Sequence, residues 1–324
     1  MMLSRMAEAL YWMSRNLERA DNTARLLQTN LMHLVGSGDA AFGDQWAPLL
    51  TITGSGPAFD AFAGNEDATR DNVVPYMTQE RTNPNSIYNS IRLARENARV
   101  VRDSISREMW ESLNQTWLWS ESALQNPLSP DRAPAFYSQL RGTVARFQGL
   151  TDGTMMNGES YGFHRLGMFI ERADMTARIL DVKYHILLPS VAEVGSPLDY
   201  YQWGVLLKSV SGFEAYRRLH HIGIRPVDVT EFVVFNEDFP RSLIFCTMRM
   251  AAALDQIGES ASPSSRRAIH ELINMLTDRD PEDVFQSGLH EFLQEFLRRV
   301  ATLHGAIQSD FFDPKLGAAH ALQD

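Results

Sequence analysis

The chain has 324 residues and a net charge of −10 at pH 7, with 44% hydrophobic and 22% charged residues. This length fits two domains or one large domain, and the apolar content is too high for an intrinsically disordered protein. The acidic balance repels phosphate backbones, so we expect no nucleic-acid partner. No stretch reaches about 18 consecutive apolar residues, so we expect no membrane span and a cytoplasmic protein.

The first predicted element is a long amphipathic helix near the N-terminus. Its apolar residues recur at spacings of three and four, a pattern typical of one face of an α-helix. They are Leu10, Met13, Leu17, Ala20, Ala24, Leu27 and Leu31. The small residues in the middle of this face predict the close approach of another helix. Beside it runs a charged edge within the stretch ERADNTARLL, residues 18–27.

A second long helix is predicted after Asn83, which we expect to cap it with Pro84 at its first position. Its apolar face comprises Ile87, Ile91, Ala94, Ala98, Val101 and Ile105. It carries the charged stretch ARENAR, residues 94–99. The short apolar runs LLTIT, before this helix, and EFVVF, later in the chain, fit either a strand or a buried helix.

The charged stretch returns as ERADMTARIL at residues 171–180, 153 residues after the first copy. Its helix has the same apolar register: Phe163, Leu166, Ile170, Ala173, Ala177, Leu180 and Tyr184. Three further matches follow in the same order, 156 or 157 residues apart: Trp46 with Trp203, Pro84 with Pro240, and Gly149 with Gly305. A counterpart of the capped helix starts near Pro240, with Asp238 as its expected cap.

We therefore predict an all-α fold, a bundle of long helices built from two tandem halves related by a pseudo-two-fold axis. The halves are residues 1–158 and 159–324, and we expect them to form one unit. The single cysteine, Cys246, lies in an apolar run and is expected to be a buried core residue.

The candidate functional site is formed by the charged edges of these helices. Glu18 and Asp21 repel each other at i and i+3, so an arginine from the other half, a metal ion or a cationic ligand must compensate. Arginine in turn suits a carboxylate or a phosphate. The candidate polar network is Glu18, Arg19, Asp21, Arg25, Arg95, Glu96, Arg99, Glu171, Arg172, Asp174 and Arg178.

Three interpretations of this network remain open. It is a structural set of ion pairs, or a ligand site in which Glu18 or Glu171 acts as a general base beside an arginine anion clamp, or a metal site. Di-iron carboxylate bundles need Glu-x-x-His, which does not occur, so no metal is predicted. A phosphate-binding loop of the GxxxxGK[ST] type is also absent, so we expect no nucleotide cofactor in this chain.

The opening stretch that ends in ERAD, together with NPNSI, ARENAR and SREMWESLN, resembles the bacterial alpha-E family. This is an all-helical group of unknown function, named for a Glu-Arg motif. The resemblance covers essentially the whole chain and places the motif on Glu18–Arg19 and on Glu171–Arg172. Members are typically encoded beside a circularly permuted ATP-grasp protein and a transglutaminase-like protease, and fusions to the ATP-grasp partner occur.

The resemblance therefore implies a partner or substrate-binding component of an ATP-grasp-dependent system that ligates amides or modifies peptides. ATP and Mg²⁺ would belong to the ATP-grasp partner, and a transglutaminase-like protein is a further expected partner. Two alternatives remain: an enzyme in its own right that uses the Glu/Arg network, and a purely structural helical dimer or other homo-oligomer. The second half lacks ARENAR, so a site lined by that stretch would be single and asymmetric.

Overall fold

The computed structural model describes residues 2–34, 46–64, 66–129, 131–187, 197–221, 223–258 and 263–313. In these residues there are fourteen α-helices and no strand, which confirms the all-α prediction. The first seven are α1 Ser4–Leu34, α2 Ala47–Ile52, α3 Gly56–Ala63, α4 Arg70–Thr78, α5 Ile87–Val100, α6 Arg107–Ala123 and α7 Ala133–Thr154. The others are α8 Glu159–Leu187, α9 Pro197–Ser209, α10 Phe213–Leu219, α11 Pro226–Phe235, α12 Leu243–Ile257, α13 Pro263–Thr277 and α14 Pro281–Ile307.

Both ambiguous apolar runs are helical, LLTIT in α2 and its C-cap and EFVVF in α11. A short 3₁₀ helix spans Arg102–Ser104, and a π-helical turn spans Gln308–Phe312 after α14. None of the helices in the described part of the chain is long and apolar enough to cross a membrane.

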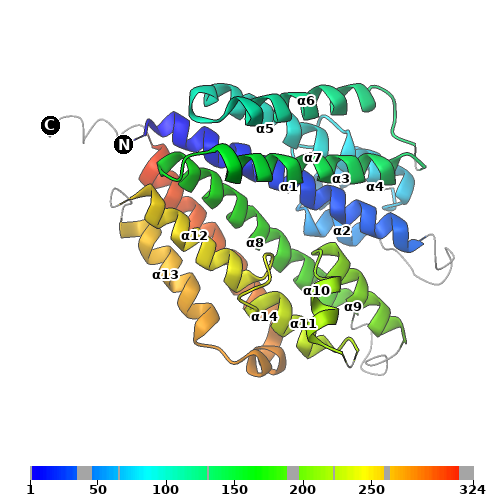
Figure 1. The fold of residues 1–324 in the computed structure, drawn as a ribbon. Coiled ribbons are helices and arrows are strands. Elements are labelled where there is room, and N and C mark those ends of the chain that lie inside the picture. Colours follow the sequence, from blue (N-terminus) through cyan, green and yellow to red (C-terminus); the bar gives the residue numbers. More distant parts are fainter. Residues whose placement is uncertain are drawn as a thin grey trace.

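The two helices that carry the repeated stretch, α1 and α8, pack against each other in the middle of the fold (Figure 1). Helices α5 and α7 pack on α1, and α6 contacts both α5 and α7. Helices α12 and α14 pack on α8, and α13 contacts both of those. Contacts also run across the middle, from α2 to α8 and from α9 to α1. One cluster of buried apolar side chains includes residues from both halves of the chain.

The apolar faces of α1 and α8 form the centre of this core. The seven predicted positions of α1 are at most 4% exposed, and the first six of α8 are at most 1% exposed. The side chain of the seventh, Tyr184, lies outside the described residues. At Gly167 of α8, a β-carbon would overlap the Tyr11 carbonyl oxygen and the Ser14 hydroxyl of α1. A residue without a side chain is therefore what allows the two backbones to approach so closely here.

The predicted caps of α5 and α12 are wrong. Ser86, not Asn83, caps α5, and Ser242, not Asp238, caps α12. Each serine has an extended backbone, and its hydroxyl accepts a hydrogen bond from the N–H three residues later, at 3.2 Å and 3.1 Å. The chain after each proline first makes a turn, so a serine in the turn replaces the residue before the proline as the cap.

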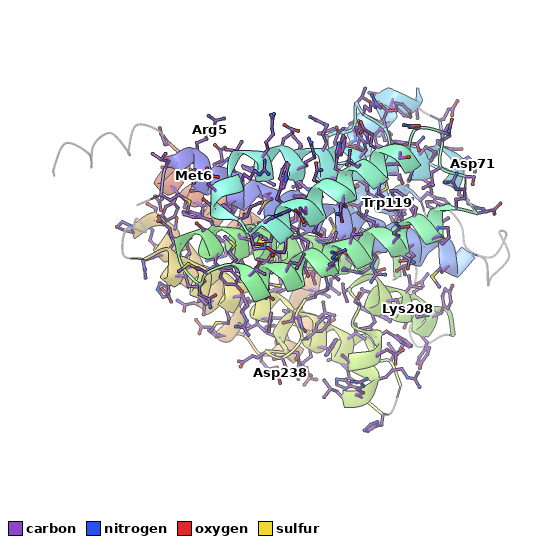
Figure 2. The ribbon with its side chains drawn as sticks, turned by 45° about the horizontal axis from the view of Figure 1, so that its top comes forward. Arg5, Met6, Asp71, Trp119, Lys208 and Asp238 are labelled. Carbon is purple, nitrogen blue, oxygen red and sulfur yellow. The ribbon has the colours of Figure 1, made fainter. Side chains whose placement is uncertain are left out.

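Aromatic side chains bind α6 to its neighbours. Trp117 is only 8% exposed, and Trp119, which Figure 2 labels, stacks on Phe136 of α7 with ring centroids 4.9 Å apart. Cys246 of α12 is a free, buried thiol, as predicted. Burial raises the pKa of this thiol to about 12, so it stays protonated and unreactive at neutral pH.

Candidate functional site

The glutamate of each repeated motif pairs with the arginine of the other motif. Arg172 of α8 donates from Nε and Nη2 to the two Glu18 carboxylate oxygens at 2.9 Å and 3.0 Å. Arg19 of α1 donates from the same two atoms to Glu171 at 2.6 Å and 3.1 Å. Both glutamates are buried, and both pairs are bidentate, the strongest geometry for this kind of contact. This exchange ties α1 to α8.

Around Glu18 the charges are enclosed by the protein. Arg241, in the turn before α12, donates to Glu18 at 2.8 Å and to Asp21 at 3.1 Å. Arg25 forms a further ion pair with Asp21, four residues earlier on α1. An arginine from the second half thus offsets the repulsion between the two carboxylates. These side chains are all buried or nearly buried, and none is more than 13% exposed.

Electrostatics fixes the protonation of this enclosed network. Burial alone would raise the pKa of the Glu18 carboxyl, but the guanidinium groups of Arg172 and Arg241 outweigh burial and hold that pKa well below its usual range. Burial and the neighbouring Arg25 charge lower the pKa of Arg241 to about 10. Both groups therefore remain charged at neutral pH, as an ion pair inside the protein.

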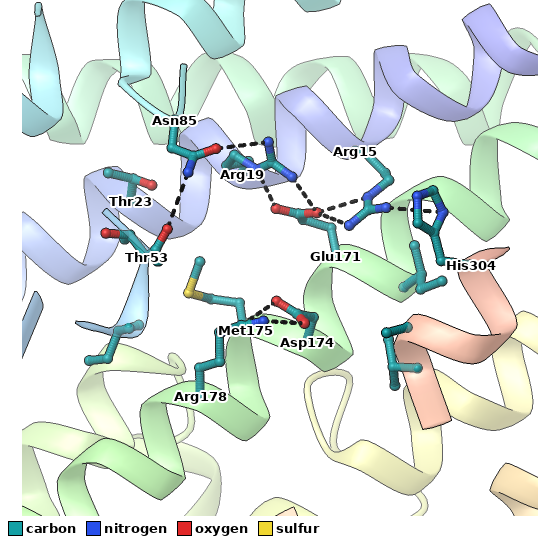
Figure 3. A pocket seen from close by; sticks show the side chains of 15 residues that line it. Arg15, Arg19, Thr23, Thr53, Asn85, Glu171, Asp174, Met175, Arg178 and His304 are labelled. Atoms are coloured by element: carbon teal, nitrogen blue, oxygen red, sulfur yellow. Dashed lines mark hydrogen bonds and ion pairs between the residues drawn. The ribbon is translucent and has the colours of Figure 1, made fainter. Parts of the chain in front are cut away.

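A cavity of about 350 Å³ lies beside Glu171, the glutamate of the second motif. Figure 3 shows Arg19 and Arg15 on either side of the Glu171 carboxylate. Arg15 donates to Glu171 from Nε at 2.9 Å, so two guanidinium groups share one carboxylate. Asp174 accepts from Arg178 at 2.7 Å at the same cavity. Three arginines therefore face two carboxylates around this space.

His304 of α14 lines the cavity next to Arg15. Its Nδ1 lies 2.8 Å from the Tyr11 hydroxyl, and the two rings stack with centroids 5.6 Å apart. Burial and the Arg15 charge lower the pKa of His304 to about 4, and burial raises that of Tyr11 to about 12. Both are neutral at pH 7. Because the Tyr11 hydroxyl accepts from Arg15 at 3.2 Å, the network places its proton toward His304 Nδ1.

Hydrogen-bond donors are left over in the cavity. Thr23 Oγ1 is buried, lines the cavity and has no hydrogen-bond partner among the described residues. Arg19 directs Nε and Nη2 to Glu171 and Nη1 to Asn85 Oδ1, at 3.2 Å. A guanidinium carries five N–H groups, so two of those on Arg19 remain available.

The two arginines also set the acid–base character of Glu171. Burial would raise its pKa, but Arg19 and Arg15 outweigh burial and lower the pKa to about 2. A general base works best when its pKa lies near the working pH. Glu171 is therefore an ionised acceptor that holds two arginines in place, and a weak base.

The structure divides the predicted site residues into three groups. The cavity is lined by Arg19, Glu171, Asp174 and Arg178. The enclosed network contains Glu18, Asp21, Arg25 and Arg172. The remaining three lie apart on α5, where Glu96 pairs with Arg95 at 2.9 Å and with Arg99 at 2.8 Å.

Sequence reasoning missed several residues of both networks: Tyr11, Arg15, Asn85, Gln148, Arg241 and His304. The matched prolines and glycines of the sequence give an indication of four of them. Asn85 and Arg241 each follow one of the paired prolines. Gln148, which donates to Glu18 at 3.1 Å, and His304 each precede one of the paired glycines.

The part of the chain that the structure describes contains no set of side chains suited to binding a metal ion. No group of three or more His, Cys, Asp and Glu side chains is placed there to hold a metal ion. The carboxylates of the two networks are instead engaged by arginines.

Comparison with known proteins identifies a family. The Alpha-E model, described as a predicted alpha-helical domain with a conserved ER motif, matches residues 2–312, which confirms the resemblance read from the sequence. The chain is 24% identical over 322 residues to the uncharacterized proteins Mb2597 of Mycobacterium bovis and Rv2567 of Mycobacterium tuberculosis. These matches cover 94% of this chain and 36% of each relative, so the chain spans about a third of their length. No solved structure matches the chain.

Proposed function

The chain belongs to the Alpha-E family, and from that premise we propose that it is the substrate-binding component of an ATP-dependent amide-ligating system. The cavity beside Glu171 is the proposed place for a carboxylate of the substrate. ATP and Mg²⁺ would be held by an ATP-grasp-type partner in the cytoplasm, since the sequence has no phosphate-binding loop of the GxxxxGK[ST] type. Amide ligation consumes a carboxylate and an amine, so recognition of a carboxylate fits this role.

The observation that carries the proposal is the excess of positive charge in the cavity. With His304 neutral, the guanidinium groups of Arg15, Arg19 and Arg178 outnumber the Glu171 and Asp174 carboxylates by one. An uncompensated charge in a partly enclosed space attracts a counter-ion more strongly than the same charge in water. The planar guanidinium fork also matches the geometry of a carboxylate.

The low pKa of Glu171 favours binding over catalysis by this residue. A carboxylate held by two guanidinium groups accepts a proton from a substrate poorly at neutral pH. Its contribution is to orient Arg15 and Arg19, which keeps their remaining N–H groups directed for a ligand.

We also infer that the cavity and the enclosed network are two versions of one site in a duplicated, pseudo-two-fold chain. Support comes from the described helices, seven before residue 158 and seven after it, and from the reciprocal contacts of α2 with α8 and α9 with α1. Arg241 stands where the first half has Asn85, and its long side chain reaches Glu18 and Asp21. In that copy the protein's own guanidinium occupies the polar space, which leaves one copy to bind a ligand.

Binding is tested by calorimetric titration with N-acetylalanine and with its uncharged amide. The acid should bind and the amide should not. The Arg19→Lys variant keeps the charge but loses the planar fork, so its affinity for the acid should fall roughly tenfold, the cost of about one charge-assisted hydrogen bond. Arg99→Lys, on the exposed part of α5, is the matched control and should bind as the wild type does. Equal binding of acid and amide, or no binding of either, would contradict the proposal.

The partner is tested separately by tagging the chain in its native host and identifying the proteins that copurify. We expect an ATP-grasp-type ligase, with a transglutaminase-like protein as a further component. Recovery of the intact chain without any ATP-grasp protein would contradict this part of the proposal.

A further inference from the structure

A second cavity, of about 440 Å³, shares two lining residues with the first. Arg19 and Asn85 line both cavities, and the hydrogen bond from Arg19 Nη1 to Asn85 Oδ1, 3.2 Å long, is part of the wall between them. Trp12 also lines the second cavity, and its ring lies 4.9 Å from the Arg15 guanidinium of the first. The side chains of Arg19 and Asn85 therefore form part of the boundary between the two spaces.

This wall is weakly held. Asn85 accepts from Arg19 at 3.2 Å and donates to the Thr53 carbonyl oxygen at 3.3 Å, both at the long end of the range for hydrogen bonds. A carboxylate that takes the Nη1 hydrogen now directed to Asn85 would release this amide. Rotation of the released amide would then open this part of the boundary, at the cost of two weak hydrogen bonds.

The second cavity combines apolar walls with amide acceptors. Trp12, Leu93 and Val100 supply the apolar part. Asn16 and Asn97 each donate Nδ2 to the carbonyl oxygen four residues earlier in their own helix, at 2.7 Å and 2.9 Å. That bond fixes which atom is nitrogen, and no described residue donates a hydrogen bond to either Oδ1. Asn16 lines this cavity and is only 3% exposed, so its Oδ1 can accept a hydrogen bond from a ligand there.

We propose that the two cavities form one site for the carboxyl-terminal end of a short peptide. The terminal carboxylate binds Arg15 and Arg19 in the first cavity. The preceding residues pass Asn85, place their apolar side chains against Trp12 and Leu93, and donate backbone N–H groups to Asn16 and Asn97. A peptide supplies both features that the second cavity lacks, amide donors and apolar side chains, which a simple sugar or a fatty acyl chain does not combine.

This inference rests on the proposed carboxylate-binding role and adds the identity of the rest of the ligand. It also gives a part of ARENAR a function, because Asn97 is its fourth residue. The charged members of that stretch pair with one another away from the first cavity, whereas the asparagine lines the second.

The test compares three probes by calorimetric titration of the full chain: N-acetylalanine, N-acetyl-trialanine and N-acetyl-trialanine amide. The longer acid should bind at least about tenfold more tightly than the shorter one, the effect of roughly two ordinary hydrogen bonds. The longer amide should bind poorly. The Asn97→Leu variant keeps the side-chain size and removes the acceptor. In this variant the gain in affinity of N-acetyl-trialanine over N-acetylalanine should fall severalfold, while N-acetylalanine itself binds as before. The matched control Asn126→Leu, on an exposed loop, should leave every affinity unchanged.

The outcomes separate the two proposals. If both acids bind with equal affinity, or if Asn97→Leu keeps the full gain, the peptide site is overturned while the carboxylate site stands. If neither acid binds, both are overturned. Circular dichroism of Asn97→Leu checks that the variant is folded, and Val100→Trp, which fills the second cavity from an exposed position, should abolish the same gain independently.

Discussion

Replacement of Glu171 by glutamine is the most informative perturbation of the reciprocal ion pairs. Glu171→Gln keeps the size of the side chain but leaves Arg15 and Arg19 without their shared carboxylate. The pKa of Glu171 falls from 4.5 to about 2 in the folded chain. At about 1.4 kcal/mol per pH unit, this shift corresponds to roughly 3 kcal/mol of stability. Breaking one partner of a buried pair costs about 3–5 kcal/mol, which is the same order.

The sign of the pH dependence follows from the depressed pKa. The contribution of Glu171 is fully present above pH 4.5 and is lost as the pH falls toward about 2. The free energy of unfolding of Glu171→Gln should therefore lie roughly 3 kcal/mol below that of the wild type at pH 7. At pH 3 the difference should shrink to roughly 1–2 kcal/mol, because the wild-type carboxylate is then almost fully protonated in the unfolded chain and still mostly ionised in the folded one.

Urea unfolding followed by far-ultraviolet circular dichroism at both pH values measures this difference. Glu96→Gln is the matched control, because the Glu96 side chain is 38% exposed and its ion pairs with Arg95 and Arg99 are at the surface. Its cost should stay below about 1 kcal/mol. A cost for Glu171→Gln that is equal at pH 7 and pH 3, or no larger than that of the control, would refute the reasoning.

Further predictions follow from the packing and the pKa shifts. Gly167→Ala should lower the free energy of unfolding by about 1–3 kcal/mol through overpacking against α1, while Gly149→Ala, whose β-carbon meets open space in α7, should not destabilise the protein. Cys246 should react with a thiol reagent at neutral pH only after denaturation, and rapid labelling of the native protein would contradict its burial. Binding of N-acetylalanine should not change between pH 8 and pH 6, since the pKa of His304 is about 4, and a titration in that range would contradict the neutral His304.

The central helices could be predicted because the apolar spacing that defines them lies within each helix's own stretch of sequence. The apolar spacing in α1 and α8 defined their faces, and the small residues Ala20, Ala24, Ala173 and Ala177 are all fully buried there. The caps were not predictable in the same way. Asn83 and Asp238 are good capping residues by type, but the turns after the prolines place Ser86 and Ser242 at the helix starts instead.

The candidate site was predictable in its glutamates and only in part in its arginines. The motif itself placed Glu18, Arg19, Glu171 and Arg172 on charged edges, but their exchange of partners is a property of how α1 meets α8. Arg241 comes from a turn more than 200 residues from Glu18, and the sequence marks it only by its place after the matched Pro240. Its contact with Glu18 depends on tertiary packing.

The charged members of ARENAR show the opposite case. Arg95, Glu96 and Arg99 resemble the repeated motif in type and spacing, yet they pair among themselves on α5. Neighbouring residues on one helix can satisfy one another locally, so a charged pattern alone does not distinguish a self-contained surface cluster from a site.

The most direct test of the account is a crystal structure of the chain with N-acetylalanine. We predict the ligand carboxylate in the cavity beside Glu171, with its oxygens about 3 Å from nitrogen atoms of Arg15 or Arg19. The enclosed network around Glu18 should be unchanged and hold no ligand. A cavity that stays empty at a saturating ligand concentration, or a ligand bound beside Arg241 instead, would contradict the central claim that the cavity beside Glu171, and not the network around Glu18, binds a carboxylate.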